Sequence, residues 1–316
     1  IVAVKYVCRR LLQLIPILLG ITFLSFAMMH VAGSDVVTQL YTNRGVEVSQ
    51  EIIDAKRAEL GLDKPFLTQY FTWLKGMLTG DMGISYVTGR NVLDTFMEKL
   101  PATLLLTVLS ILLTVLISIP LGILAAIKQG KWMDHLLRIS SFIGNAMPNF
   151  FVAILLMELL SIKLGWLPVI ASDVSFQSAI MPTLTLAISM SAKYMRQVRA
   201  TVLEELNKDY VIGLKARGVR SRDILWKNVM KSAMVTILTL LALSIGSLLG
   251  GTAIIESIFM WDGVGKLAVD SINMRDYPMI LAYVVWMAII YVAVNLLTDI
   301  SYRFLDPRIR LGGDKE

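Results

Sequence analysis

Long apolar stretches separated by polar connections dominate the hydrophobicity pattern of this chain. Six of them hold about 20 mostly apolar residues or more, the length that an α-helix needs to cross the hydrocarbon core of a bilayer. They cover Leu11–Val31, Leu100–Ile127, Ile139–Ile162, Val174–Ala192, Ser232–Ile255 and Tyr277–Thr298. Because each peptide group must find its hydrogen bond inside the segment at that depth, the pattern predicts an all-α membrane protein with six transmembrane helices.

Few residues within these spans oppose a membrane helix. Glu158 is the only acid or base there apart from histidine, and we expect it to pair with Lys163 near the outer end of the third span. Neighbouring helices can satisfy the carbonyl groups that a proline frees, so the prolines are expected to kink the spans rather than end them. These prolines are Pro16, Pro120, Pro148 and Pro182.

Composition and charge agree with a membrane protein and predict its orientation. Hydrophobic residues make up 56% of the chain and charged residues 17%, whereas about a quarter of an average soluble domain is charged. Of the 30 basic residues, 20 lie in the segments that share a side with both termini, together with nine of the 24 acids. By the positive-inside rule, both termini and the connection 193–231 are expected in the cytoplasm.

Charge and residue types argue against several other functions. Membrane topology accounts for the net charge of +6, and the basic segments lack interleaved aromatic residues, so nucleic-acid binding is not expected. Cys8 is the single cysteine, which excludes a disulfide within the chain or a cluster of thiolate ligands. His30 and His135 fall on opposite sides of the expected membrane and cannot share a metal ion. No metal or cofactor is expected to bind this chain directly.

The outer connection 32–98 is too long for a simple loop. Ser49 is placed to cap a helix that Gly61 ends, and Pro65 opens a second helical stretch, from Phe66 to Leu78. We therefore expect a small folded extracytoplasmic cap. It is interpreted either as a packed lid over the helices or as a docking face for an extracytoplasmic solute-binding protein.

The inner connection 193–231 is nearly forty residues long, and crossing a bilayer does not require such a segment. Asp209 is placed to cap a short helix from Tyr210 to Arg217, which Gly218 can end, and Ser221 begins another that leads to the fifth span. The short helix is interpreted as lying across the cytoplasmic face, either docked on a partner or resting on anionic lipid. Three basic residues spaced by three continue the fourth helix beyond the membrane: Lys193, Arg196 and Arg199.

At this connection the sequence resembles the membrane subunits of binding-protein-dependent ABC importers, in particular the dipeptide, oligopeptide and nickel permease family. The likeness covers nearly the whole chain. In that family the loop between the fourth and fifth spans holds a short coupling helix that fits a groove on a partner ATPase. The residues that match it here are Asp209, Tyr210 and Val211, followed by Lys215, Ala216, Arg217 and Gly218.

Other motifs are similar to the patterns of this family in their order and spacing. They are Arg9-Arg10, Leu60-Gly61-Leu62-Asp63-Lys64-Pro65 with Gln69-Tyr70, Gly80-Asp81-Met82-Gly83-Ile84-Ser85, Met147-Pro148-Asn149-Phe150, Arg275-Asp276-Tyr277-Pro278 and Asp306-Pro307-Arg308-Ile309-Arg310. The sequence departs from the usual patterns at Ser34-Asp35, Thr236 and Asp262. These departures bear on the subfamily more than on the family.

The resemblance implies the fold of a type I ABC importer permease in a bacterial cytoplasmic (inner) membrane. It also implies partners: a second, homologous permease subunit in a heterodimer, two ATP-binding subunits and an extracytoplasmic solute-binding protein. Because the chain lacks a Gly-x-x-x-x-Gly-Lys-Ser/Thr loop, ATP and Mg²⁺ are expected on the partner subunits, and this chain is not expected to be an enzyme. Fifth-span glycines are candidate pathway-lining residues, although close helix packing explains them equally well. They are Gly246, Gly250 and Gly251.

The chain is accordingly divided at the ends of these segments. Residues 1–31 form the N-terminus and first span, 32–98 the cap, 99–192 the second to fourth spans, 193–231 the coupling connection, and 232–316 the last two spans and the tail.

The solute is the most open question. The short outer connection 163–180 favours the nickel or metal-chelate branch of the family, and a short peptide is the alternative. A chelate held through its organic shell and a peptide both fit an interior poor in histidine.

An ion-coupled secondary transporter is the alternative from another class, and it needs intramembrane coupling residues or an inverted repeat. Within the spans, only Glu158 qualifies as such a coupling residue. A membrane-embedded enzyme needs converging acids, histidines or a nucleophile, and none converge.

Overall fold

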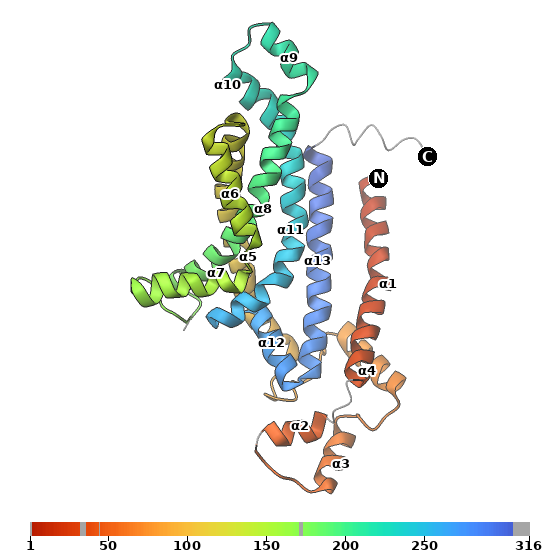
Figure 1. Cartoon of the computed structure of the whole chain (residues 1–316). Coiled ribbons are helices and arrows are strands. Elements are labelled where there is room, and N and C mark those ends of the chain that lie inside the picture. Colours follow the sequence, from red (N-terminus) through yellow and green to blue (C-terminus); the bar gives the residue numbers. More distant parts are fainter. Residues whose placement is uncertain (1, 32–35, 44, 171–172, 306–316) are drawn as a thin grey trace. The chain divides into compact units, whose positions relative to one another are not determined.

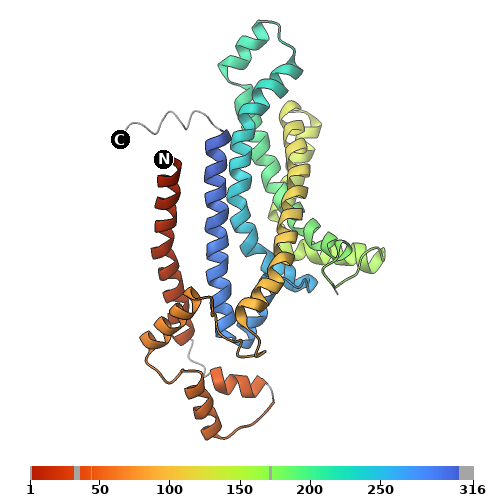
Figure 2. The ribbon, with the colours of Figure 1, turned by 180° about the vertical axis from the view of Figure 1, so that it is seen from behind.

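A computed structural model describes residues 2–31, 36–43, 45–170 and 173–305. Helices and the turns between them make up this part of the chain (Figures 1 and 2). Within it, the only pairing of extended backbone is an isolated antiparallel bridge between Ile84 and Asn91. The chain divides into two compact units, one formed by residues 1–103 and 262–292 and the other by residues 104–261 and 293–316.

The first unit contains the N-terminal helices and two later ones. Its elements are α1 (Val2–Val31), α2 (Val36–Asn43), α3 (Gln50–Glu59), α4 (Phe66–Leu78), the start of α5 (Val92–Ile127), α12 (Val264–Met274) and the first part of α13 (Tyr277–Leu305). Aromatic rings join α1 to α4, because the ring of Phe26 meets those of Phe66 and Tyr70 at centroid distances of 5.4 and 5.6 Å. The hydroxyl groups of Tyr70 and Thr22 lie 3.1 Å apart. Helix α4 is therefore packed on α1.

The ends of α3 and α4 follow their sequence signals. Ser49 is the N-cap residue of α3, although its side chain makes no capping hydrogen bond. Gly61 follows that helix with a φ of +68°, in the left-handed region that glycine adopts without strain. Pro65 immediately precedes α4. The predicted helical stretches of this segment are confirmed.

A buried aspartate connects the segment before α5 to the start of α13. The carboxylate of Asp276 accepts hydrogen bonds from the Ser85 hydroxyl at 2.5 Å and from the backbone N–H of Tyr86 at 3.0 Å. Burial raises the pKa of the Asp276 carboxyl, and the hydrogen bonds from Ser85 and Tyr86 oppose this rise. These bonds place the residues around Tyr86 beside the first turn of α13.

The second unit contains the longest run of packed helices. Its elements are the rest of α5, α6 (Trp132–Ala146), α7 (Asn149–Leu156), the π-helical η1 (Met157–Lys163), α8 (Phe176–Leu206), α9 (Asp209–Ala216), α10 (Ser221–Asp223), the π-helical η2 (Ile224–Val229) and α11 (Met230–Phe259). Its core combines buried side chains of α8, such as Val198, with Ile237 of α11. Helix α5 approaches α8 closely at Gly122, where a Cβ atom would lie 2.6 Å from the Cβ of Val198. Helix α8 extends well past Ala192, which confirms that the predicted fourth helix continues beyond its apolar part.

The structure corrects the expectation for one proline. Pro16 and Pro182 lie inside continuous helices, as expected. Pro148, however, separates two helices instead of kinking one, because Met147 leaves the helical conformation and Pro148 becomes the N-cap residue of α7. Helix α6 and the α7–η1 segment are bent by 102° at this break. A residue before proline avoids the α conformation, which explains why the helix ends there.

Length and composition alone do not identify all six expected spans in the structure. In the described part of the chain three helical stretches are long and apolar enough to cross a membrane: Val92–Ile127, Ser221–Leu241 and Tyr277–Leu296. The bent pair Trp132–Ala146 and Asn149–Lys163 makes a fourth if it forms one span. Within α1, Ile15–Val31 is a shorter apolar stretch.

A buried ion pair joins α6 to α8 in the second unit. The carboxylate of Asp134, only 1% exposed, accepts hydrogen bonds from Nε and Nη2 of Arg199 at 2.7 and 2.8 Å. It also accepts a hydrogen bond at 3.0 Å from the backbone N–H of Gly130, in the turn before α6. The hydrogen bonds from Arg199 lower the pKa of Asp134 to about 2, more than burial raises it.

Replacing Asp134 by asparagine should destabilise the protein by about 1.5–3 kcal/mol, the range for hydrogen bonds to charged groups. A carboxyl whose pKa is lower in the folded chain stabilises it above about pH 4, and this contribution is lost as the pH falls towards 2. Thermal unfolding in detergent should therefore show a larger loss between about pH 7 and pH 3 for the unchanged protein than for the Asp134→Asn variant. Asp223→Asn is the control, since Asp223 forms a more exposed pair with Lys227 at 2.8 Å. Equal effects of both variants would contradict the assigned role of Asp134.

Candidate functional site

The candidate site is the polar connection between α8 and α11. Figure 1 shows α9 and α10 beyond the ends of these two helices, at one end of the second unit. Asn207 ends α8, α9 follows after one residue, and α10 continues through η2 into α11. The connection is thus an ordered helical excursion rather than a loose loop.

Local signals explain where α9 begins and ends. Lys208 is its N-cap residue and Asp209 its first helical residue, so the prediction that Asp209 caps the helix is wrong by one position. A carboxylate in the first turn still favours the helix through its dipole. At the other end Gly218 has a φ of +76° and its N–H bonds to the carbonyl of Lys215 at 3.0 Å. The predicted glycine stop is confirmed.

Apolar side chains hold one face of α9 against the rest of the unit. Val211 is fully buried, and Leu214, three residues further along, packs against the same core cluster. Ile224 and Leu225 of η2 belong to that cluster as well. Burial of these side chains fixes α9 to the connection that leads into α11.

A buried glutamate anchors the start of α9. Glu205, in the last turn of α8, is 9% exposed and accepts a hydrogen bond from the Tyr210 hydroxyl at 2.9 Å. It also pairs with the ammonium group of Lys208. Burial, followed by the hydrogen bond to Glu205, raises the pKa of Tyr210, so its hydroxyl stays a donor at neutral pH. Our sequence reasoning missed Glu205. The available signal was an acid in the last turn of a helix, where the dipole disfavours negative charge.

The outward face of the connection carries unpaired positive charge and apolar side chains. In the part of the chain that the structure describes, no carboxylate lies within ion-pair distance of its exposed cations Lys215, Arg217, Arg220 and Arg222. Ile212 and Trp226 are 60% and 56% exposed. Gly213 lies between Ile212 and Leu214 in α9 with open space around its α-carbon. This surface suits a partner that offers acidic groups and an apolar groove.

The six residues predicted for coupling lie together on α9 and its last turn. Asp209, Lys215, Ala216, Arg217 and Gly218 are exposed, whereas the Tyr210 hydroxyl is turned back to Glu205. The candidate pathway glycines Gly246, Gly250 and Gly251 lie in α11. Gly246 is half-buried, and the surroundings of Gly250 and Gly251 lie outside what the structure describes. Their pathway role stays a prediction.

Several other residues and motifs singled out in the sequence can be compared with the structure. The expected pair of Glu158 and Lys163 is present, with 3.5 Å between the carboxylate and the ammonium group. Asp262, where the sequence departs from the family pattern, forms an ion pair with Lys99. Ser34-Asp35 and the closing motif Asp306-Pro307-Arg308-Ile309-Arg310 lie outside the described residues.

Comparison with protein-family models covers almost the whole chain. Residues 118–311 match the model described as binding-protein-dependent transport system inner membrane component. Residues 3–107 match the model of the N-terminal part of such membrane components.

Individual proteins show the same likeness. The oligopeptide transport system permease protein AppB of Bacillus subtilis (strain 168) is 39% identical over 314 residues, which cover 96% of this chain and 98% of that protein. The glutathione transport system permease protein GsiC of Escherichia coli (strain K12) is 35% identical over 306 residues, covering 97% and 99%.

Solved structures show a shared fold. Inward-facing conformations of the methionine ABC transporter MetNI include a chain with a TM-score of 0.55 at 16% identity, covering 67% of this chain and 96% of that chain. A chain of an amino acid ABC transporter with histidines has a TM-score of 0.51 at 16% identity, covering 66% and 94%. The predicted class of fold, that of an ABC importer permease, is confirmed by this likeness.

Removing the Glu205 carboxylate should loosen the start of α9. Because Tyr210 and Lys208 both lose their acceptor in Glu205→Ala, amide hydrogen exchange in α9 should accelerate about tenfold or more, given about 1.5–3 kcal/mol for hydrogen bonds to a charged group. Hydrogen-exchange mass spectrometry of the purified protein measures this rate. Glu204→Ala is the matched control, since Glu204 is the exposed neighbour. Equal exchange rates in both variants would show that Glu205 does not anchor α9.

Proposed function

The chain belongs to the binding-protein-dependent ABC importer permeases of the dipeptide and oligopeptide family, and on this premise we propose that it is one permease subunit of an ATP-driven importer of short peptides. The observation that carries the mechanism is the connection built around α9. Its inner face is anchored by Val211 and Glu205, and its outer face presents exposed cations. A rigid projection of this kind can transmit a push or pull to the helices on both sides of it.

The proposed topology has six transmembrane helices with both termini in the cytoplasm and the segment 32–98 outside. Three apolar helices and the bent pair α6 and α7–η1 supply four spans, and α1 and α8 supply the others. Helix α8 is less apolar because hydroxyl-bearing residues of its membrane part face other protein segments, as buried Thr183, Thr185 and Ser191 show. Polar side chains in membrane helices favour such interior positions.

The proposed partners follow from the family and from the free surface of α9. Permeases of this family work with ATPase subunits and a solute-binding protein. We infer a heterodimer with a second, homologous permease, two ATPases that bind the α9 surfaces, and a binding protein that docks outside. ATP and Mg²⁺ bind to the ATPases. Nucleotide-driven movement of α9 would then shift α8 and α11 and switch the pathway between inward and outward access.

A short peptide is the solute that the relatives support. One is named as an oligopeptide permease and another as a glutathione permease, and glutathione is itself a small peptide. The preference for nickel or a metal chelate, expected from the short connection 163–180, has no support from these relatives and stays a prediction. It is the second outcome that a solute test must distinguish.

The coupling role gives a direct prediction. Reversing both charges in Lys215→Glu/Arg217→Glu, or placing leucine at Gly218 with its φ of +76°, should separate ATP hydrolysis from uptake while the protein still inserts in the membrane. Uptake by the complex in vesicles should fall about tenfold or more if each lost ion pair is worth about 1 kcal/mol. Lys163→Glu is the control, because this lysine lies far along the chain and is exposed.

Unchanged ATP-dependent uptake in both coupling variants would refute the role of α9. Uptake that persists without any ATPase and follows an ion gradient would identify the alternative, an ion-coupled secondary transporter.

The solute prediction is tested with the complex purified through a tag on this chain and reconstituted in vesicles. Labelled peptides of two to five residues, glutathione and a nickel–histidine chelate are supplied with the binding protein and ATP. We expect accumulation of a peptide and weaker accumulation of the chelate. Exclusive accumulation of the chelate would contradict the proposed solute and leave the proposed transport class intact.

A further inference from the structure

The third span exposes two asparagine side chains that packing within this chain does not use. Asn145 lies in the last turn of α6, and Asn149 is the first residue of α7, on the other side of the break at Pro148. Both residues are exposed, and within the described part of the chain neither side-chain amide forms a hydrogen bond. Each amide offers two N–H donors and an acceptor oxygen. Unused hydrogen-bonding groups thus stand on the surface of an apolar segment.

The break also leaves backbone acceptors free. Pro148 has no N–H, so the carbonyl of Gly144 lacks the donor that a continuous helix supplies. Met147 and Pro148 both have extended backbone, and among the described residues the carbonyl of Asn145 accepts no backbone hydrogen bond either. Figure 1 shows α7 turning away from α6 at this point, where the bend is 102°.

These polar groups lie deep in the membrane in the proposed topology. Arg138 is the last charged residue before Glu158, and it marks the inner end of the third span. At a rise of about 1.5 Å per residue, the helix from Arg138 to Met147 is about 14 Å long. The hydrocarbon core is about 30 Å thick. With α6 crossing the bilayer, the break therefore lies close to the middle of the core.

Acyl chains are unsuitable neighbours for this break. Lipid offers no hydrogen bond, so unpaired backbone groups at membrane depth are tolerated only where they are covered by protein or line a water-filled cavity. Apolar side chains near the break, such as Ile139 and Ile154, are exposed and suit acyl chains, whereas the amides of Asn145 and Asn149 do not. The surface that contains the two amides therefore faces protein or water.

A water-filled pathway explains the break better than a packed contact with the second permease does. In a packed contact, each amide and each free carbonyl needs a fixed partner, because an unpaired polar group there costs the free energy of a lost hydrogen bond. In a pathway, water pairs with the same groups between passages of the solute. The many unused donors and acceptors at the break thus favour the pathway.

The break is connected to helices that the coupling connection would move. Helix α7 contacts both α8 and α11, and its residues Val152 and Ala153 are buried. Before the break, α6 approaches α8 closely, since a Cβ atom at Gly144 would lie 2.9 Å from the Cβ of Ala192. The Ser141 hydroxyl donates to the carbonyl of Ala192 at 2.5 Å. Movement of α8 would therefore displace the break with it.

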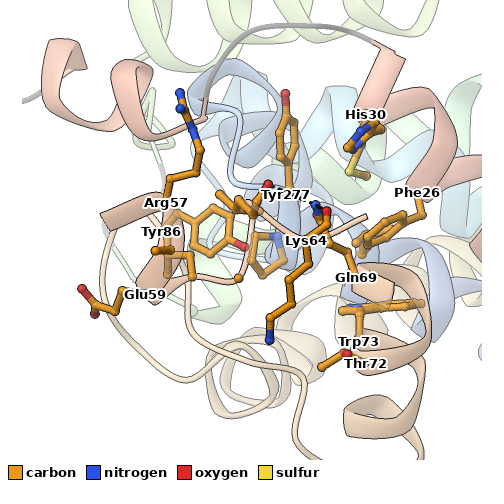
Figure 3. Close-up of a pocket in the computed structure, with 17 residues that line it drawn as sticks. Phe26, His30, Arg57, Glu59, Lys64, Gln69, Thr72, Trp73, Tyr86 and Tyr277 are labelled. Carbon is orange, nitrogen blue, oxygen red and sulfur yellow. Dashed lines mark hydrogen bonds between the residues drawn. The ribbon is translucent and has the colours of Figure 1, made fainter. Parts of the chain in front are cut away.

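The pocket of the first unit is a different kind of polar feature. It has a volume of about 600 Å³, and its lining includes Lys64, Gln69 and Tyr86 (Figure 3). These residues belong to the segment 32–98, which lies outside the membrane in the proposed topology, where water reaches polar groups. The Gln69 amide also donates to the carbonyls of Leu62 and Lys64 at 3.1 and 2.7 Å. Polar groups of this pocket thus need no pathway to satisfy them.

We propose that the break between α6 and α7 lines the translocation pathway and that the amides of Asn145 and Asn149 hydrogen-bond the peptide groups of the solute. The inference rests on the proposed function, the import of short peptides, and adds residues that contact the solute. Each peptide group has one donor and one acceptor, which an asparagine amide matches whatever side chains the solute carries. Neutral hydrogen bonds are weak enough to release the solute afterwards.

Thiol reactivity measures whether the break faces water. Cys8 is the single cysteine of the chain, so a Cys8→Ser background gives Asn145→Cys and Asn149→Cys the only thiol of this subunit. A charged, membrane-impermeant methanethiosulfonate is added on both sides of vesicles that hold the complete complex, without nucleotide or with ATP and vanadate. Mass spectrometry of this chain gives the labelling rate. Leu116→Cys is the matched control, because Leu116 is an apolar residue of the second span and is 70% exposed.

Asn145→Cys and Asn149→Cys should each react about tenfold faster than Leu116→Cys, or more, in at least one nucleotide state, because the reactive thiolate forms in water and not in hydrocarbon. A transported peptide at about ten times its dissociation constant should slow this labelling about tenfold, by mass action.

Removal of the amides tests the contact with the solute independently. Asn145→Ala/Asn149→Ala should lower uptake at a low peptide concentration about tenfold, as expected for the loss of two neutral hydrogen bonds. Asn145→Gln/Asn149→Gln keeps the amide groups and should lose less uptake. Ser140→Ala is the control, because Ser140 is an exposed residue of α6 whose hydroxyl donates to the carbonyl of Leu136 at 3.0 Å, and its uptake should be unchanged.

Three results would overturn the proposal. Unreactive thiols in both nucleotide states would show that lipid or protein covers the break, and reactivity that appears only after removal of the second permease would identify a subunit interface. Equal uptake by the double alanine variant and Ser140→Ala would exclude a contact with the solute. Absence of ATP-driven peptide uptake by the Cys8→Ser complex would refute the proposed function, whereas uptake with unreactive thiols would refute only the role of the break.

Discussion

A buried carboxylate in an apolar helical protein must be paired, and this requirement determines how the polar connections of this chain are held. Asp134, Glu205 and Asp276 lie at or near helix ends, and each is buried. Each accepts a hydrogen bond from a connecting segment: the turn before α6, the start of α9, and the residues around Tyr86. Leaving any of the three acids unpaired would cost several kcal/mol, roughly as much as a mutation that removes a partner of a buried ion pair.

These carboxylates serve different parts of the proposed mechanism. Glu205 holds the start of α9 against the end of α8, and in the proposed mechanism this contact would carry force from the exposed face of α9 to the membrane helices. Asp134 ties α8 to α6 near the same end of the second unit. In the first unit, Asp276 instead holds the residues around Tyr86 at the start of α13. The same kind of interaction thus holds α9 in the second unit and the residues around Tyr86 in the first.

The positions where helices end in this chain depend partly on local sequence and partly on packing. At Gly61 and Gly218 the backbone has positive φ, and each glycine ends a helix where the sequence predicted an end. Pro148 is different, because a proline inside an apolar stretch fits both a kinked span and a break. Neighbouring helices decide between these outcomes by satisfying or not satisfying the freed backbone groups. In this chain the outcome is a bend of 102°.

The sequence alone determined the helical membrane class, the family, and the positions of α3, α4 and α9, because apolar length, glycine stops and motif order are local properties of the chain. Its motifs also indicated the residues proposed for the coupling surface. Only the tertiary structure revealed the anchoring role of Glu205, the pair of Asp134 and Arg199, and the hydrogen bond between Ser85 and Asp276. The reason is physical: Asp134 and Arg199 are 65 residues apart, and Ser85 and Asp276 are 191 apart. Packing brings such distant residues into contact, and no local sequence pattern predicts which of them will meet.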